Sequence, residues 1–398
     1  MASIHKKRIA IYSGKYPDST FINSLMELLT ETGEFEIWLF GNRAKGAKVP
    51  REFKHQFRTK SKLINVILIA WAVLVLILRG EKNVLAFVNR CRKQYDNYDQ
   101  IIRVLCDSLF VWKARIEVLH LNWILHYLDF EYFLEFNKNV QLISSVRGTH
   151  FTMRGAVNNE AQDIIQKSFS RSKTIHCVSE YFARVARSDY MDVEGKLKVI
   201  TPGVDVSLFN ARKGAPKNKT PFLVTVARLH WIKGHAYTLK ALHELKEEGF
   251  DFRYEMIGSG TQQEELTFLI DFYGLSDQVK LHGKLDQKDL VKIMHTADAF
   301  VLSSVEEGFC NAALEAQAIG LPCIVSNAGG LAENVANGST GFHFESRSVE
   351  SLKNAIRKFA DLPHQEQEQM GLKGIDRVKS DFNLTDKVEE FRTLYAES

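Results

Sequence analysis

The second half of the chain alternates short apolar runs with segments whose apolar residues recur at helical spacing. Five runs rich in β-branched and aromatic residues read as strands buried on both faces: residues 221–229, 252–258, 279–283, 298–304 and 322–327. Between them lie segments such as HAYTLKALHELKEEG, with apolar residues three and four apart and a closing glycine. This strict alternation predicts a parallel, doubly wound sheet with right-handed crossovers.

The first half begins with the same rhythm. KRIAIYSG predicts a strand that ends in a glycine turn, STFINSLMELLTETG predicts a helix, and IEVLHLNW, VQLISSVRG, TIHCVSE and KLKVITPG predict further strands. A length of 398 residues also favours two domains over one. We therefore predict an α/β protein with two Rossmann-like domains facing an interdomain cleft. They would cover residues 1–203 and 204–375, and a C-terminal helix over residues 376–398 would cross back to the first domain.

Residues 41–80 depart from this rhythm. Residues 43–62 hold eight Lys or Arg and one acid, and residues 63–78 are apolar except for Asn65. A helix over that run would be about 24 Å long, which is too short to span a bilayer. Two interpretations stay open: a fully buried core helix, or an interfacial helix that the basic stretch holds against anionic lipid. The second predicts a peripheral membrane contact through residues 43–78.

Composition and charge narrow the function classes. With 45% hydrophobic and 25% charged residues the chain is ordinary globular protein. Residues 1–203 carry 30 Lys and Arg against 20 Asp and Glu, whereas the remainder carries 22 against 28, so the first half is expected to face something anionic. The apolar run beside the basic stretch, with no stacking aromatics at readable spacing, argues against a nucleic-acid binder.

The cysteines and the N-terminus bear on the compartment. The five cysteines form no CxxC pair, and the N-terminal apolar stretch of four residues is too short for a secretory signal. We expect a cytoplasmic chain, placed at the inner face of the membrane if residues 43–78 bind lipid.

The clearest chemical motif is EGFCNAALEA at 307–316. It places Glu307 in the loop after a strand and Glu315 on the following helix, with the backbone N–H groups of residues 311–313 exposed between them. A helix start binds phosphate through its free donors and its dipole, and flanking carboxylates accept hydrogen bonds from sugar hydroxyls. The motif therefore suits a nucleotide sugar, although two glutamates on an amphipathic helix are often only solvated surface.

A second cluster, RLHWIKG, follows the strand VTVA directly. Arg228 and Lys233 at a strand's carboxyl end can clamp a diphosphate, although surface exposure is the commoner fate of such cations. Gly258 and Gly260 end the next strand and would let a nucleotide approach the backbone, a weak signal on its own. Gly14, after the first strand, would open the acceptor side and is included with the predicted donor-binding residues.

Together these motifs resemble the retaining glycosyltransferases of family 4, which have the GT-B fold. The matching features are Arg228 to Lys233, the Glu307 and Glu315 pair, GVDVSLF, Gly258-Ser-Gly260, and the two glycines before Glu333. The start of the chain, Tyr16-Pro17 followed by STFI, is similar to members that build bacterial exopolysaccharide, capsule or other lipid-linked glycans. The resemblance is nearly full length apart from residues 41–115.

The resemblance implies roles for these residues. Arg228 and Lys233 would bind the donor diphosphate, Glu315 the ribose, and Glu307 hydroxyls of the transferred sugar. The remaining predicted donor-binding residues are the nucleobase loop Gly283, Lys284 and Leu285, and the phosphate-binding turn Phe309, Cys310, Asn311 and Ala312. The leaving phosphate would help to take the acceptor's proton, so no protein nucleophile is named.

Two positions depart from the family pattern. Arg147 stands where members often have His, in Arg147-Gly148-Thr149-His150, so either His150 compensates or Arg147 contacts a phosphate or an acidic sugar. Cys310 stands where many members have Gly, and we interpret it as tolerated packing. No DxD motif occurs in the chain, so we expect no metal site and no cofactor besides the donor.

The predicted function is transfer of a hexose-type sugar from a UDP- or GDP-sugar to a glycan or lipid-linked acceptor in polysaccharide biosynthesis. Two alternatives remain open. A nucleotide-sugar epimerase of the same fold would turn over the donor without an acceptor. A non-catalytic sugar- or lipid-binding relative would keep the fold, and the altered Arg147 motif is its only support.

Overall fold

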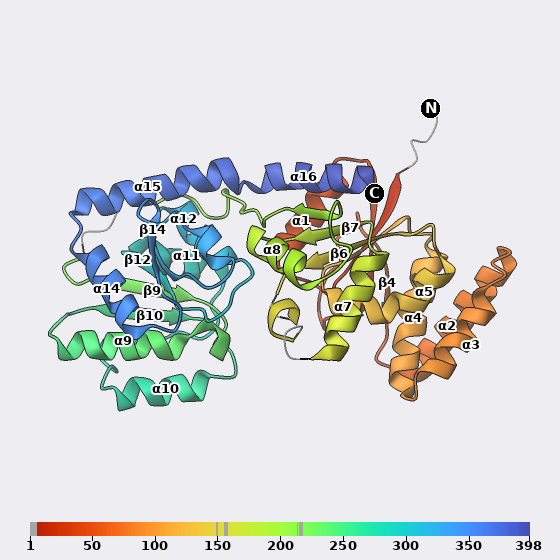
Figure 1. Ribbon diagram of the computed structural model, residues 1–398, viewed down its shortest axis with the longest axis horizontal. Coiled ribbons are helices and arrows are strands. Elements are labelled where there is room, and N and C mark those ends of the chain that lie inside the picture. Colours follow the sequence, from red (N-terminus) through yellow and green to blue (C-terminus); the bar gives the residue numbers. More distant parts are fainter. Residues whose placement is uncertain (1–5, 149, 155–157, 213, 215–217) are drawn as a thin grey trace. The chain divides into compact units, whose positions relative to one another are not determined.

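The computed structural model describes residues 6–148, 150–154, 158–212, 214 and 218–398 (Figure 1). The chain divides into two compact units. Unit 1 comprises Met1–Val178, Ala183–Ile200 and Val388–Ser398, and unit 2 comprises Ser179–Phe182 and Thr201–Lys387. Each unit is built on a parallel sheet with helices packed against it.

The sheet of unit 1 reverses its strand order at β1. Its order is β2-β3-β1-β5-β6-β7-β8, with β4 paired to β3, and every strand pairing is parallel. The strands are β1 (Lys7–Tyr12), β2 (Lys15–Tyr16), β3 (Phe35–Arg43), β4 (Lys54–Arg58), β5 (Val118–Leu121), β6 (Gln141–Val146), β7 (Thr174–Cys177) and β8 (Leu197–Val199). Because β3 and β5 lie on opposite sides of β1, the loops after β1 and β5 diverge and leave room for a ligand there.

The helices around this sheet are α1 (Thr20–Glu31), α2 (Lys62–Leu78), α3 (Val84–Gln94), α4 (Tyr98–Lys113), η1 (Ile124–His126), α5 (Tyr127–Phe136), η2 (His150–Arg154), α7 (Asn159–Arg171), α8 (Glu180–Asp189) and α16 (Leu384–Glu397). Helix α4 is central to the core, since residues Val104 to Trp112 are all buried. Asn97 caps it by accepting from the backbone N–H groups of Asp99 and Gln100.

The sheet of unit 2 has the order β11-β10-β9-β12-β13-β14, again with parallel pairings. Its strands are β9 (Phe222–Val226), β10 (Arg253–Ile257), β11 (Val279–Leu281), β12 (Ala299–Leu302), β13 (Cys323–Ser326) and β14 (Gly341–Phe344). Its helices are η3 (Trp231–Lys233), α9 (His235–Glu247), α10 (Gln263–Phe272), α11 (Gln287–Thr296), α12 (Asn311–Ile319), α13 (Leu331–Asn334), α14 (Val349–Ala360) and α15 (His364–Asp381). Strand order reverses between β9 and β12.

The domain limits differ from the predicted ones. The main division falls after Ile200, and the predicted limit at 375 lies inside α15, which continues to Asp381. Only α16 follows it, and residues Val388–Ser398, which include most of that helix, belong to unit 1. There Tyr395 Oη lies 2.6 Å from His120 Nδ1, and Lys7 Nζ donates to the carbonyl of Tyr395 at 2.9 Å.

Helix α2 confirms the predicted helix at 63–78 but contradicts the interpretation that it is fully buried. Only Asn65, Ala72 and Leu76 are buried, whereas Leu63, Ile67 and Trp71 are 71%, 58% and 56% exposed. Within the described residues, no helix is long and apolar enough to cross a membrane.

Candidate active site

Two loops meet where the strand order of unit 2 reverses. The loop after β9 and the loop after β12 are joined by Val305, whose N–H donates to the carbonyl of Ile232 at 2.8 Å, and by Ser303, whose hydroxyl donates to the carbonyl of Gly234 at 2.7 Å. Gly234 has φ +65°, and a Cβ there would lie 1.9 Å from the carbonyl oxygen of Ser303. Only glycine permits this approach, which brings the two predicted motifs together.

Lys233 and Glu307, the predicted diphosphate and sugar contacts, form an ion pair across these loops. Both side chains are mostly buried, and Ser304 Oγ donates to the same carboxylate oxygen at 3.2 Å. Burial alone would disfavour the Lys233 cation, but the facing carboxylate outweighs it and the pKa of Lys233 lies above its ordinary value. Lys233 therefore stays protonated at the carboxyl edge of the sheet, and the paired carboxylate of Glu307 balances its charge in the free protein.

Arg228 supplies a second cation at this edge. Its side chain is exposed, and among the described residues no carboxylate forms an ion pair with it. Its charge acts on Lys233, where it partly opposes the effect of Glu307 on the lysine pKa. Arg228 is therefore a close positive charge that remains available to an anionic ligand.

The start of α12 is held in place by a side chain that the sequence analysis missed. Asn334 accepts from the N–H of Cys310 at 3.0 Å through Oδ1, and its amide donates to the carbonyl of Cys310 at 3.1 Å. Gln317 donates in turn to the carbonyl of Asn334 at 2.8 Å. This clamp fixes the direction of the first N–H groups of α12, those of Asn311 and Ala312 included, which have no partner within the helix.

Cys310 and Phe309 both point into the protein. Cys310 is 6% exposed, and burial raises the pKa of its thiol to about 12, so the thiol stays protonated at neutral pH. The ring of Phe309 lies 5.8 Å from that of Phe382. The packing interpretation of Cys310 agrees with these facts, and Phe309 would act on a ligand only through its backbone.

Glu315 lies on the second turn of α12 and is half-buried. Burial raises its pKa to about 7. No hydrogen bond or ion pair offsets that burial within the part of the chain that the structure describes. A carboxylate held in this state gains free energy from a ligand that donates hydrogen bonds to it.

Gly258 and Gly260 lie beside this site for a reason other than ligand access. A Cβ at Gly258 would lie 1.8 Å from the carbonyl oxygen of Ala227, and one at Gly260 would lie 2.1 Å from that of Leu229. These glycines therefore let the turn after β10 pack on the loop that carries Arg228. The N–H of Gly258 also donates to the carbonyl of Gly283 at 2.8 Å, so the loop with exposed Lys284 and half-buried Leu285 joins the same edge.

Unit 1 has a polar network at its own point of strand-order reversal. Asn122, which follows β5, donates to Ser13 Oγ at 2.8 Å, and Ser13, which follows β1, donates to Asp18. Arg147, which follows β6, reaches Asn122 Oδ1 at 3.4 Å, and burial lowers its pKa despite the nearby Asp18. Arg147 thus lies at the carboxyl edge of its sheet, and the side chain of His150 is outside the described part.

A pocket of about 380 Å³ opens beside this network. Its polar lining is Ser13, Arg103, His126 and Asp129, and its apolar lining includes Trp123. Gly14 backs it, because a Cβ there would lie 2.7 Å from the His126 ring.

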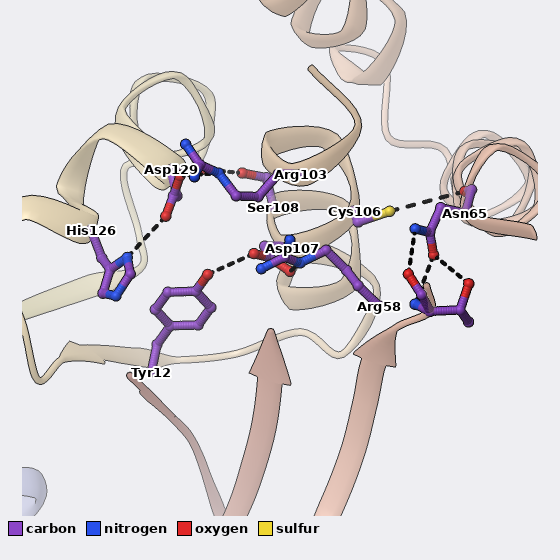
Figure 2. Close-up of polar contacts among 10 residues, drawn as sticks. Tyr12, Arg58, Asn65, Arg103, Cys106, Asp107, Ser108, His126 and Asp129 are labelled. Carbon is purple, nitrogen blue, oxygen red and sulfur yellow. Dashed lines mark hydrogen bonds and ion pairs between the residues drawn. The ribbon is translucent and has the colours of Figure 1, made fainter. Parts of the chain in front are cut away.

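Asp129 organises the pocket. It is 4% exposed and accepts from Arg103 Nε at 3.1 Å and from His126 Nδ1 at 3.0 Å (Figure 2). The sequence analysis missed these three residues, and the nearest feature it predicted was the strand IEVLHLNW.

A second buried carboxylate contacts Tyr12, whose ring packs edge-on against that of His126 in the pocket lining. Asp107 accepts from Tyr12 Oη at 2.6 Å and from Arg58 Nε at 2.9 Å (Figure 2). Burial raises the pKa of Asp107 to about 6, although the arginine opposes the rise. Among the described residues no group of three His, Cys, Asp or Glu side chains is placed to hold a metal ion.

Part of the chain is similar in sequence to known glycosyltransferases. Residues 208–377 match the sequence model of a family described as glycosyl transferases group 1. One relative is WcaL of Salmonella typhimurium, which is provisionally named a colanic acid biosynthesis glycosyltransferase. It is 28% identical to this chain over 224 residues, which are 55% of each chain. A glycogen synthase of Mycobacterium tuberculosis is 34% identical over 168 residues, which are 42% of this chain and 41% of its own. The chain thus matches about half the length of these curated relatives.

The fold extends the likeness to the whole chain. The structure of Alr3699/HepE from Anabaena in complex with UDP and glucose matches with a TM-score of 0.71, covering 99% of this chain and 100% of that one at 14% identity. At that identity the match shows the fold alone. The fold is GT-B, which confirms both the predicted α/β class and the resemblance to GT-B glycosyltransferases.

Proposed function

We propose that this chain, a GT-B protein whose residues 208–377 match the group 1 glycosyl transferases, is a retaining glycosyltransferase of family 4. It would transfer a hexose-type sugar from a UDP- or GDP-sugar to a glycan or lipid-linked acceptor in polysaccharide biosynthesis. One observation carries the proposal: Arg228, Lys233 and the clamped start of α12 lie on one edge of the unit 2 sheet, where its strand order reverses.

These groups suit the donor diphosphate. Negative charge grows on the diphosphate as the glycosidic bond breaks, so fixed cations and helix N–H groups stabilise the transition state more than the ground state. In the free protein Lys233 is paired with Glu307. A bound diphosphate would pair with Lys233 in place of Glu307. The carboxylate of Glu307 could then accept hydrogen bonds from hydroxyls of the transferred sugar.

Glu315 suits the ribose. Its pKa of about 7 reflects burial without a partner, and two ribose hydroxyls would provide the missing donors. The loop at 283–285 would contact the base through its backbone. UDP in the structure of HepE supports a uridine donor for this fold, and we propose UDP before GDP on that ground.

The pocket in unit 1 suits a sugar of the acceptor. Trp123 offers an aromatic face against which a sugar ring can stack, and Asp129, Arg103 and His126 offer hydrogen-bonding partners for its hydroxyls. A phosphate of a lipid-linked acceptor could bind Arg147 in the adjacent network.

The reaction would need no metal ion. The chain has no DxD motif, and the cations described above can neutralise the leaving diphosphate without one. All five cysteines are free thiols, which suits the reducing cytoplasm, where we place the enzyme.

The test is turnover of UDP- and GDP-hexoses by the purified protein in EDTA, with and without a lipid-linked oligosaccharide fraction. The proposal expects nucleoside diphosphate release that depends on the acceptor, and a proton NMR coupling at the new anomeric centre that matches the donor's configuration. An epimerised nucleotide sugar formed without acceptor would favour an epimerase. Nucleotide binding without any turnover would favour a non-catalytic subunit, and an inverted product would refute retention.

A further inference from the structure

Helix α2 presents a continuous apolar surface to solvent. Eight large side chains on it are between 37% and 77% exposed: Leu63, Ile64, Val66, Ile67, Trp71, Leu74, Ile77 and Leu78. At about 100° per residue these positions fall within an arc of about 160°, so they share one face along the whole helix. We name these eight side chains the apolar face of α2. Single exposed apolar residues are ordinary, but a contiguous stripe of this kind marks an interaction surface.

The opposite side of α2 is fixed to unit 1, so the apolar face cannot turn inward. Ala72 and Leu76 belong to the core that includes α4. Asn65, the only polar residue of the apolar run, is buried: its side chain accepts from the N–H of Thr59 and donates to the carbonyl of Thr59, both at 2.9 Å. Cys106 on α4 donates to the carbonyl of Asn65 at 3.9 Å (Figure 2). The helix thus buries its polar residue and exposes its apolar ones.

Cations flank the apolar face at both ends. Residues 43–62 hold eight Lys or Arg against one acid, and residues 79–93 hold five against one. Lys60 before the helix and Arg79 and Lys82 after it are exposed. Lys62 is paired with Asp99 at 2.5 Å. The surface therefore combines a strip of large apolar side chains with positive charge at its two ends.

This combination matches the surface of an anionic bilayer. Large apolar side chains enter the boundary between headgroups and acyl chains, and lysine and arginine at that depth pair with anionic headgroups. The 17 residues of α2 are too few to cross the bilayer. A second copy of this chain fits less well, because the positive charges at the ends of the two apolar faces would then lie close together and repel one another.

We propose that the apolar face of α2 docks unit 1 onto an anionic lipid bilayer, with the helix lying in the interfacial plane. Docking of this kind would hold unit 1 at the surface where a lipid-linked acceptor is displayed. The inference does not depend on sugar transfer, because lipid binding is measured without donor or acceptor.

The experiment is flotation of the full chain with vesicles of phosphatidylcholine alone and with 30% phosphatidylglycerol, a composition of about one anionic lipid in three. We expect binding to the anionic vesicles that weakens in high salt. The triple variant Ile67→Ser/Trp71→Ser/Leu74→Ser should bind about 100-fold more weakly, since three large apolar contacts are lost. Phe268→Ser/Phe272→Ser on α10 is the matched control, because these residues are 63% and 68% exposed in unit 2. It should bind like the unchanged protein.

Two further readouts separate docking from misfolding and from self-association. The melting temperature of the triple variant should equal that of the unchanged protein, because the three side chains are exposed. Tryptophan emission should shift to the blue and be quenched by brominated lipid, and Trp71→Phe should remove most of that quenching while vesicles still bind. Equal vesicle binding by the triple variant would overturn the proposal. A dimer that the triple variant dissociates, without vesicle binding by either protein, would assign the face to a second copy instead.

Discussion

The carboxyl edges of the two sheets support their polar side chains in different ways. In unit 2 the cations and carboxylates come from loops that directly follow β9 and β12, and backbone contacts such as Val305 to Ile232 join those loops. In unit 1 the pocket depends on Arg103 and Asp129, which lie on helices α4 and α5 and meet only through tertiary packing. A site formed by consecutive residues of a loop can be recognised in the sequence as a short motif. A site formed by residues from separate helices leaves no such motif. We propose that the first binds the donor and the second the acceptor, so changes in the two should affect different kinetic constants.

The largest expected effect is that of Lys233→Ala. It removes a buried cation from the diphosphate and leaves Glu307 without its partner. We expect kcat/KM to fall by about 100- to 1000-fold, the usual loss when one preorganised group that stabilises a transition-state charge is removed. Steady-state turnover of the preferred nucleotide sugar measures it. Lys288→Ala, an exposed lysine of α11, is the control and should retain full activity. A comparable rate for both variants would contradict the donor assignment.

Asp129→Asn should affect the other site. It leaves Arg103 and His126 without the carboxylate that orients them. We expect the KM for the acceptor to rise by about 10- to 100-fold, because charged hydrogen bonds of this kind are worth about 1.5–3 kcal/mol. Nucleotide affinity, measured by calorimetry, should not change. Weaker nucleotide binding in this variant would mean that the two sites are not functionally separate.

Acidification should destabilise both units through buried histidines. Burial lowers the pKa of His176 in unit 1 to about 3 and that of His235 in unit 2 to about 4. Between pH 6.5 and these values the unfolded chain binds protons that the folded chain does not, so the free energy of unfolding falls as pH falls. Each histidine should contribute about 2 kcal/mol to the loss between pH 7 and pH 5.

Denaturant unfolding at the two pH values measures that loss. His176→Gln should reduce the difference between the two pH values, and His55→Gln, at an exposed position of β4, should leave it unchanged. The same pH dependence in all three proteins would show that His176 does not stay neutral in the folded state.

Glu315→Gln sharpens the description of the donor site. Since the pKa of Glu315 is about 7, lowering the pH to 5.5 protonates it in the free protein and removes the charge that would accept from the ribose. Nucleotide affinity should therefore rise by up to about 30-fold as pH increases from 5.5 to 8. In Glu315→Gln that rise should be smaller by the same factor. If nucleotide affinity changed with pH in the same way in both proteins, Glu315 would not contact the nucleotide.

The smallest effect is expected for Cys310→Ala. Its thiol is buried and its pKa is raised to about 12, so it has no thiolate to contribute. Turnover should stay within about threefold of the unchanged protein, since only a small buried side chain is lost. If the variant were inactive although still folded, Cys310 would instead have a chemical role.

The interior strands of unit 2 were predictable, whereas the edge strands were predicted only in part. The runs that became β9, β12 and β13 are continuous and apolar, which is what burial on both faces requires. At the sheet edges β8 and β11 were predicted, whereas β2, β4 and β14 were not. Strand β4 is KHQFR, which has a single apolar residue and therefore no apolar strand pattern; it pairs only with β3, and none of its five residues is buried. Strand β14 is GFHF, in which Gly341 and His343 interrupt the apolar residues.

The same contrast holds for the sites. Arg228, Lys233, Glu307 and Glu315 could be singled out as candidates because each lies in or next to a strong element close by in sequence, and their roles stay predictions. The clamp by Asn334 spans 24 residues, and the Arg58 to Asp107 contact spans 49 residues, so neither leaves a local pattern. Helix α2 is apolar all round, and only the structure shows which of its sides is covered.

The most direct test of the donor site is the melting temperature of the protein in EDTA with UDP, GDP, ADP and their sugar conjugates, for the unchanged chain and for Lys233→Ala. A ligand that binds only the folded state raises the melting temperature. We predict a selective rise with one base, UDP first, that is lost in Lys233→Ala and retained in Lys288→Ala. No rise with any nucleotide, with or without added Mg²⁺, would contradict the assignment of the unit 2 edge to a nucleotide sugar.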